Sequence, residues 1–230
     1  MTKFSIFKSY LTAVLINVIG TLLFLTVIRA VTGENAFIYT YLGSGWFIAL
    51  FGYEIYKYHA YLKEQWQNFK KKKWTNILIS LVSVLILIIV VTFSRKYFNQ
   101  FIPANGPKEL IIPINGFFGI FTNLYAAIIN LMVAIFEEIA FRHDMWYRYR
   151  KHKFVFGILF IITNLLFGFS HYYNFNGSFV ATIPYAFAGM ILSLLYLWRR
   201  NIWLPIFTHF IFNFPAIIGV ISIIIISLTR

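Results

Sequence analysis

The stretch Leu110–Arg142 reads LIIPINGFFGIFTNLYAAIINLMVAIFEEIAFR, and it carries no charged side chain before its two adjacent glutamates, Glu137 and Glu138. A membrane span needs about 20 apolar residues, so the run predicts a transmembrane helix. One ionised group is costly in hydrocarbon, and a neighbour of like charge adds to that cost. The pattern therefore indicates a polar site within the membrane. It also fits a helix end at the membrane surface, where Glu and Arg are hydrated.

The spacing of these charges distinguishes the two glutamates. Residues four apart share one face of a helix, so Arg142 is placed to pair with Glu138. Glu137 points about 100° away, because a helix has 3.6 residues per turn. It has no local partner. The asymmetry predicts one carboxylate that is held in place and one that is free to react.

The rest of the chain is also built from hydrophobic blocks. Its 230 residues are 60% hydrophobic and 12% charged, whereas soluble domains carry about 25% charged residues. The charge-free blocks are 9–28, 35–53, 74–94, 110–136, 154–198 and 201–229. The fifth block is too long for one crossing and is interrupted by the polar turn Tyr172–Ser178. We therefore predict an all-α polytopic membrane protein with about seven transmembrane helices.

These helices divide into two groups within a single transmembrane domain, residues 1–230. Residues 1–94 are expected to form three scaffold helices, and residues 110–228 a four-helix catalytic core. The chain contains no cysteine, which excludes disulfides and thiolate chemistry.

The net charge of +13 is explained by membrane topology. Of the 20 Lys and Arg residues, 15 fall on one side of the predicted spans. The other five are Arg29, Arg95, Lys96, Lys108 and Arg230. The positive-inside rule then places the N-terminus in the cytoplasm and the C-terminus outside. We expect the lipid bilayer as a partner, with Lys70–Lys73 near anionic headgroups, and no nucleic acid.

Two histidines interrupt the later apolar blocks. His171 is the only His, Asp, Glu, Lys or Arg between Phe154 and Trp198. His209 and Asn213 are four apart and share a helix face, and Pro215 can kink the helix after them. The remaining polar groups near span ends are expected at the wet interface: His59, His143, Asp144 and His152.

Two hydrolytic mechanisms fit Glu137, Glu138, His171, His209 and Asn213. In the first, Glu137 is a general base, the imidazoles position water and the scissile carbonyl, and Asn213 donates to the oxyanion. In the second, His171, His209 and a glutamate, with Glu138 the candidate, hold a zinc ion. The usual His-Glu-x-x-His helix is missing, so zinc has no spacing signature of its own. A pair of Ser170 with His209 is a minor third option.

The ordered motifs Glu137-Glu138-x-x-x-Arg142, Phe167-x-x-x-His171 and His209-x-x-x-Asn213 resemble the CPBP family. That family includes the type II CAAX prenyl endopeptidases and the bacterial Abi proteins linked to bacteriocin maturation and self-immunity. The resemblance implies an intramembrane protease of a bacterial cell membrane, acting on a membrane-associated peptide or protein. It implies that Glu137 activates water and that Glu138, Arg142, His171, His209 and Asn213 complete the site.

The resemblance leaves two questions open. Family members are described as metalloproteases, and a metal-free glutamate mechanism has also been argued. Zinc is therefore a candidate cofactor, and a mechanism without metal is the alternative. The alternative function is a non-catalytic immunity or scaffold protein that binds peptide with the same polar cluster. A small proton-relaying transporter is a third class, but no internal repeat supports it.

The motifs also set a geometric condition. If the fourth span ended at Glu138, His171 would lie about 26 Å deeper in the membrane, by the rise of a helix. We therefore expect that helix to continue to about Arg150, so that Glu137 and His171 share a depth. We also expect long helices that protrude into the cytosol and a cavity that opens on that side.

Overall fold

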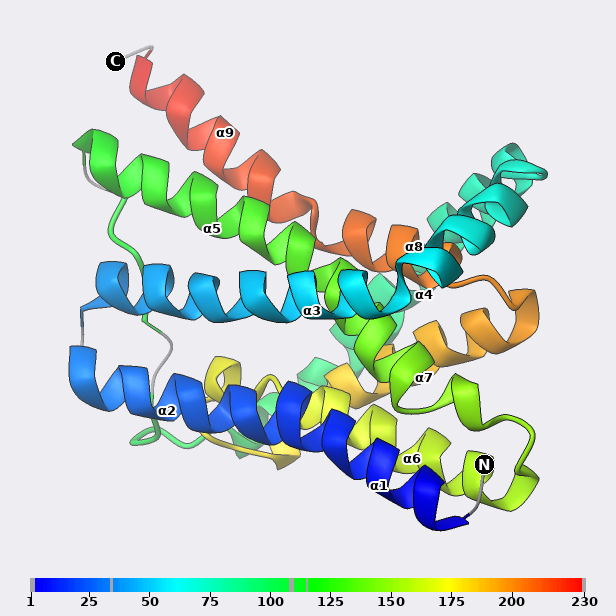
Figure 1. Cartoon of the computed structure of the whole chain (residues 1–230). Coiled ribbons are helices and arrows are strands. Elements are labelled where there is room, and N and C mark those ends of the chain that lie inside the picture. Colours follow the sequence, from blue (N-terminus) through cyan, green and yellow to red (C-terminus); the bar gives the residue numbers. More distant parts are fainter. Residues whose placement is uncertain (1–2, 34, 108–109, 115, 229–230) are drawn as a thin grey trace.

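A computed structural model describes residues 3–33, 35–107, 110–114 and 116–228 (Figure 1). All regular elements in this part of the chain are helices, which confirms the predicted fold class. The α-helices are α1 (Lys3–Val14), α2 (Thr21–Thr32), α3 (Ala36–Lys70), α4 (Lys73–Phe98), α5 (Gly116–Glu137), α6 (Lys153–Phe169), α7 (Ile183–Arg199), α8 (Trp203–Asn213) and α9 (Pro215–Leu228). Two π-helical segments, Leu15–Gly20 and Glu138–Asp144, and four 3-10 turns, Asn99–Phe101, Tyr147–Tyr149, Tyr172–Phe175 and Val180–Thr182, join them.

Five helical segments of the described chain are long and apolar enough to cross a membrane. They are Ser5–Thr32, Lys73–Phe101, Gly116–Tyr149, Val180–Arg199 and Trp203–Ile226. Helix α6 is apolar but has only 17 residues, and α3 carries Glu54 and Lys57 near its middle. The chain is thus a multi-pass membrane protein, while the count of seven spans stays a prediction. Lys108 and Arg230, which entered the charge count, lie outside the described residues.

The helices run along a common direction and have two distinct ends. The start of α1 lies at the same end of the bundle as the turn between α3 and α4, and the end of α9 lies at the opposite end (Figure 1). Helix α5 packs against α3, α8 and α9, and α4 packs against α7 and α8. The helical continuation past Glu137 is confirmed, since the span reaches Tyr149. It continues as a π-helix and a 3-10 turn, not as a plain α-helix.

Gly168 sets the close approach of α6 to α7. A Cβ added there would lie 2.9 Å from the Ala186 nitrogen and 3.1 Å from the Thr182 oxygen, both backbone atoms. Small residues let membrane helices come this near.

We expect Gly168→Ala to lower the free energy of unfolding by about 1–3 kcal/mol through overpacking. Thermal unfolding in detergent measures the loss. The matched control is Gly157→Ala on the same helix, where an added Cβ meets no described atom within 4 Å. Equal melting temperatures for the two variants would contradict this account of the α6–α7 contact.

Candidate functional site

Glu138 is held from two sides within the protein. Its Oε1 accepts a hydrogen bond of 2.8 Å from His209 Nδ1. Its Oε2 lies 3.1 Å from Arg142 Nε, and both of these charged residues are fully buried. The Arg142 guanidinium lies over the Phe167 ring, 4.0 Å from its centroid. The predicted Glu138–Arg142 pair is therefore confirmed, and the alternative of a hydrated helix end is wrong for these two residues.

Glu137 is placed differently from its neighbour. Its Oε2 lies 3.9 Å from His209 Nε2, which is beyond hydrogen-bond distance. Because Nδ1 of this ring donates to Glu138, Nε2 of the neutral imidazole is the acceptor. Glu137 is buried, yet it lines the large cavity described below. The expected asymmetry between a held and an open carboxylate is present.

His171 lies just beyond the end of α6. Its Nδ1 is 2.9 Å from the Phe167 carbonyl oxygen, which can only accept a hydrogen bond, so Nδ1 carries the proton and Nε2 is left as an acceptor. The ring packs on Tyr185, with 4.3 Å between centroids. The Phe167 ring contacts both His171 and His209, at 5.2 and 5.9 Å between centroids. Phe167 therefore positions both imidazoles: its ring contacts His171 and His209, and its carbonyl oxygen accepts the hydrogen bond from His171.

Asn213 ends α8, and α9 starts at Pro215, so the predicted break at the proline is confirmed. The Asn213 amide nitrogen lies 3.4 Å from the backbone oxygen of Asn130 and 3.5 Å from its side-chain oxygen. Asn130 was not predicted from the sequence as part of the site. Its position two helical turns before Glu137, on the same helix face, is a signal that could have found it.

A cavity of about 450 Å³ brings these side chains together. It is lined by Glu137, His171, His209 and Asn213, together with Asn130. Glu138 and Arg142 lie behind its wall, where they contact His209 and Phe167. The sequence-predicted site residues thus converge, with four on the cavity and two supporting them.

The cavity extends toward the end of the bundle where α2 ends and α3 begins. Its lining there includes Arg29, Tyr39, Ile112 and Asn174. The charge count assigns this end to the outside. The helix beyond Glu137 fills the other end. On which side of the membrane the cavity opens depends on the predicted orientation, so the expected opening toward the cytosol stays a prediction that this direction does not favour.

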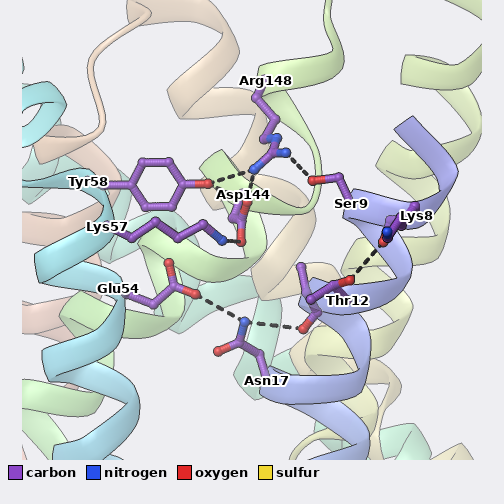
Figure 2. A network of polar contacts seen from close by, with 10 residues as sticks. Lys8, Ser9, Thr12, Asn17, Glu54, Lys57, Tyr58, Asp144 and Arg148 are labelled. Atoms are coloured by element: carbon purple, nitrogen blue, oxygen red, sulfur yellow. Dashed lines mark hydrogen bonds and ion pairs between the residues drawn. The ribbon is translucent and has the colours of Figure 1, made fainter. Parts of the chain in front are cut away.

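That other end is closed by a network of polar contacts (Figure 2). The buried Asp144 carboxylate accepts hydrogen bonds from Tyr58, Arg148 and Lys57, the last at 2.6 Å. Arg148 also donates to Ser9. These contacts tie α1, α3 and the segment after the π-helix into one unit.

Two predicted interface positions need correction. Asp144 is fully buried in this network, and His143 is buried against the Tyr61 ring, 4.0 Å between centroids. The π-helix, whose wider turn shifts the residues that follow, turns both side chains inward. His59 is exposed as expected, and His152 is half-buried.

The donors do not assemble into a metal site. Within the described residues, no three His, Asp or Glu side chains are close enough together to hold an ion. Both Glu138 oxygens and His209 Nδ1 already have partners. The proposed set of His171, His209 and Glu138 thus does not fit a zinc ion as these side chains are placed. Ser170 Oγ donates to the Phe167 carbonyl at 2.8 Å, away from His209.

Comparison with known proteins gives one family. Residues 118–215 match the family model described as type II CAAX prenyl endopeptidase Rce1-like. The match covers all six predicted site residues and confirms the resemblance that the three motifs carry. Searches of curated proteins and of solved structures found no match.

Proposed function

We propose, from the Rce1-like match of residues 118–215, that this chain is an intramembrane endopeptidase that cleaves a membrane-associated peptide or protein. The observation that carries the proposal is Glu137, a buried carboxylate that faces a cavity next to an acceptor nitrogen of His209. The proposed location is the cell membrane of a bacterium.

In the proposed reaction, Glu137 takes a proton from a water molecule as the water oxygen attacks the scissile carbonyl carbon. The proton then passes from Glu137 to the leaving amine nitrogen as the carbon–nitrogen bond breaks. The acceptor nitrogens of His171 and His209 orient the water. The Asn213 amide donates to the oxyanion, a role that single donors fill in other hydrolases.

Glu138 and Arg142 act as positioning residues. Glu138 fixes the His209 ring through its 2.8 Å hydrogen bond, which selects the tautomer. Arg142 balances the charge of Glu138 where no solvent reaches either group. A buried carboxylate without such a partner would be strongly unfavourable.

The zinc alternative stays a prediction with a direct test. We expect peptide cleavage by the purified protein to be unchanged after incubation with a strong chelator, because this mechanism uses only side chains. The cleavage rate before and after treatment, with the metal content measured in parallel, distinguishes the metal-free mechanism from the zinc mechanism. Loss of cleavage that added zinc restores would favour the metal mechanism instead.

Mapping of cleavage sites tests the function itself. Membranes from cells with wild-type or Glu137→Ala protein are compared for new peptide ends, and Glu64→Ala, on an exposed part of α3, is the matched control. We expect the ends in the wild type and the control but not in Glu137→Ala. Ends that persist in Glu137→Ala, at equal protein levels, would favour the non-catalytic binding protein.

A further inference from the structure

The two ends of the bundle differ sharply in charge. We call the end with residues 3–8, 57–74, 148–153 and 199–202 the basic end. Arg142, counted there from the sequence, is buried beside Glu138 and is not a loop charge. Without it, 14 Lys and Arg residues of the described chain belong to the basic end and three, Arg29, Arg95 and Lys96, to the opposite end. This remains a strong positive-inside bias, which orients the basic end toward the cytoplasm.

The cavity connects Glu137 to the opposite end. Beyond the site, its lining continues along α3 and α5 to Tyr39 and Ala126. It ends among Ile112 of the proline-containing loop and Asn174 of the turn after α6. Both of these segments join helix ends that lie far from the basic end. The same cavity thus contacts both Glu137 and these outer segments.

Toward the basic end, the described residues around the site are closely packed. Beneath Glu137, the side chains of Trp146, Tyr149 and Tyr196 are fully buried in one apolar cluster. The Asp144 network lies beside it (Figure 2). A peptide from this side would have to separate buried charges, which is strongly unfavourable.

We infer that the site is entered from the non-cytoplasmic side of the membrane. Its substrate is then a membrane-associated peptide or protein whose scissile bond lies outside the cytoplasm. The apolar lining by Ile129, Val133 and Phe212 suits a hydrophobic segment next to that bond. The statement about substrate rests on the proposed function, whereas the direction of access rests on charge and geometry alone.

The first test uses the absence of cysteine, because any cysteine introduced is then unique. Asn174→Cys and Lys72→Cys place one thiol at each end, both at exposed positions. Spheroplasts are treated with a membrane-impermeant maleimide. We expect Asn174→Cys to be labelled directly and Lys72→Cys only after permeabilisation. The reverse pattern would place the cavity mouth in the cytoplasm and overturn the inference.

The second test probes the cavity itself. Val133 lines the cavity, whereas Ile128, on the same helix, is exposed on the outer surface of the bundle and does not line it. A small charged thiosulfonate, added outside spheroplasts, should modify Val133→Cys and leave Ile128→Cys unmodified in lipid. If the Asn174→Cys variant is labelled from outside but the Val133→Cys variant is not modified, access to the cavity from this side would be excluded. Both readouts are chemical modification, so loss of the proposed protease activity would leave them unchanged.

Discussion

Glu137→Gln is expected to slow peptide cleavage by about 10²- to 10⁴-fold, the usual contribution of a general base. Glutamine keeps the shape of the side chain but cannot take a proton from water. No hydrogen bond joins Glu137 to a described side chain, and its Oε2 lies 3.9 Å from His209 Nε2. The substitution therefore strands no buried partner. Single-turnover cleavage of a mapped substrate in liposomes measures the rate constant.

Folding must be separated from chemistry in this experiment. The melting temperature of Glu137→Gln should stay close to that of the wild type. Glu64→Gln, on an exposed part of α3, should cleave at the wild-type rate. A Glu137→Gln protein that is folded and cleaves within a few-fold of the wild type would exclude this carboxylate as the base.

Arg142→Met is expected to cause the largest loss of stability, about 3–5 kcal/mol. Methionine fills much of the space over the Phe167 ring but leaves the Glu138 carboxylate buried without its cation. Unfolding in mixed detergent measures the difference. Arg150→Met is the control, because Arg150 is exposed at the basic end, and surface changes usually stay within about 0.5 kcal/mol.

The double variant Glu138→Gln/Arg142→Met tests the cause of that loss. Removal of both charges leaves no uncompensated ion, so the double variant should be more stable than Arg142→Met alone. Its cleavage rate should nevertheless be low, because His209 has lost its carboxylate partner. A double variant as unstable as the sum of the single changes would show that Glu138 and Arg142 do not act as a pair.

Spacing along one helix was the most informative signal. The Glu138–Arg142 pair, the shared face of His209 and Asn213, and the break at Pro215 follow from local geometry, and the structure has all three. Helix periodicity depends on nearby residues only, so a sequence can report it. The same periodicity, applied to the two turns before Glu137, would have predicted Asn130 on the face of that glutamate.

The expectations that were wrong share one cause. His143 and Asp144 were assigned to the wet interface because polar residues after an apolar run usually are hydrated. The π-helix after Glu137 turns both inward. Asp144 is then held by the nearby Arg148 and by Tyr58 and Lys57 of the distant helix α3, and His143 packs on Tyr61 of the same helix. The same packing closes the basic end. The cavity therefore extends toward the opposite end.

The sequence by itself determined that this chain is a helical membrane protein, which side groups share a helix face, and which motifs tie it to the Rce1-like proteins. These properties follow from the length of each hydrophobic run and from the helical period, both of which can be read within a single segment. Only the tertiary structure decided that Glu137, His171, His209 and Asn213 line one cavity, and at which end that cavity opens. Those properties depend on contacts between segments far apart in the chain, which no local pattern encodes.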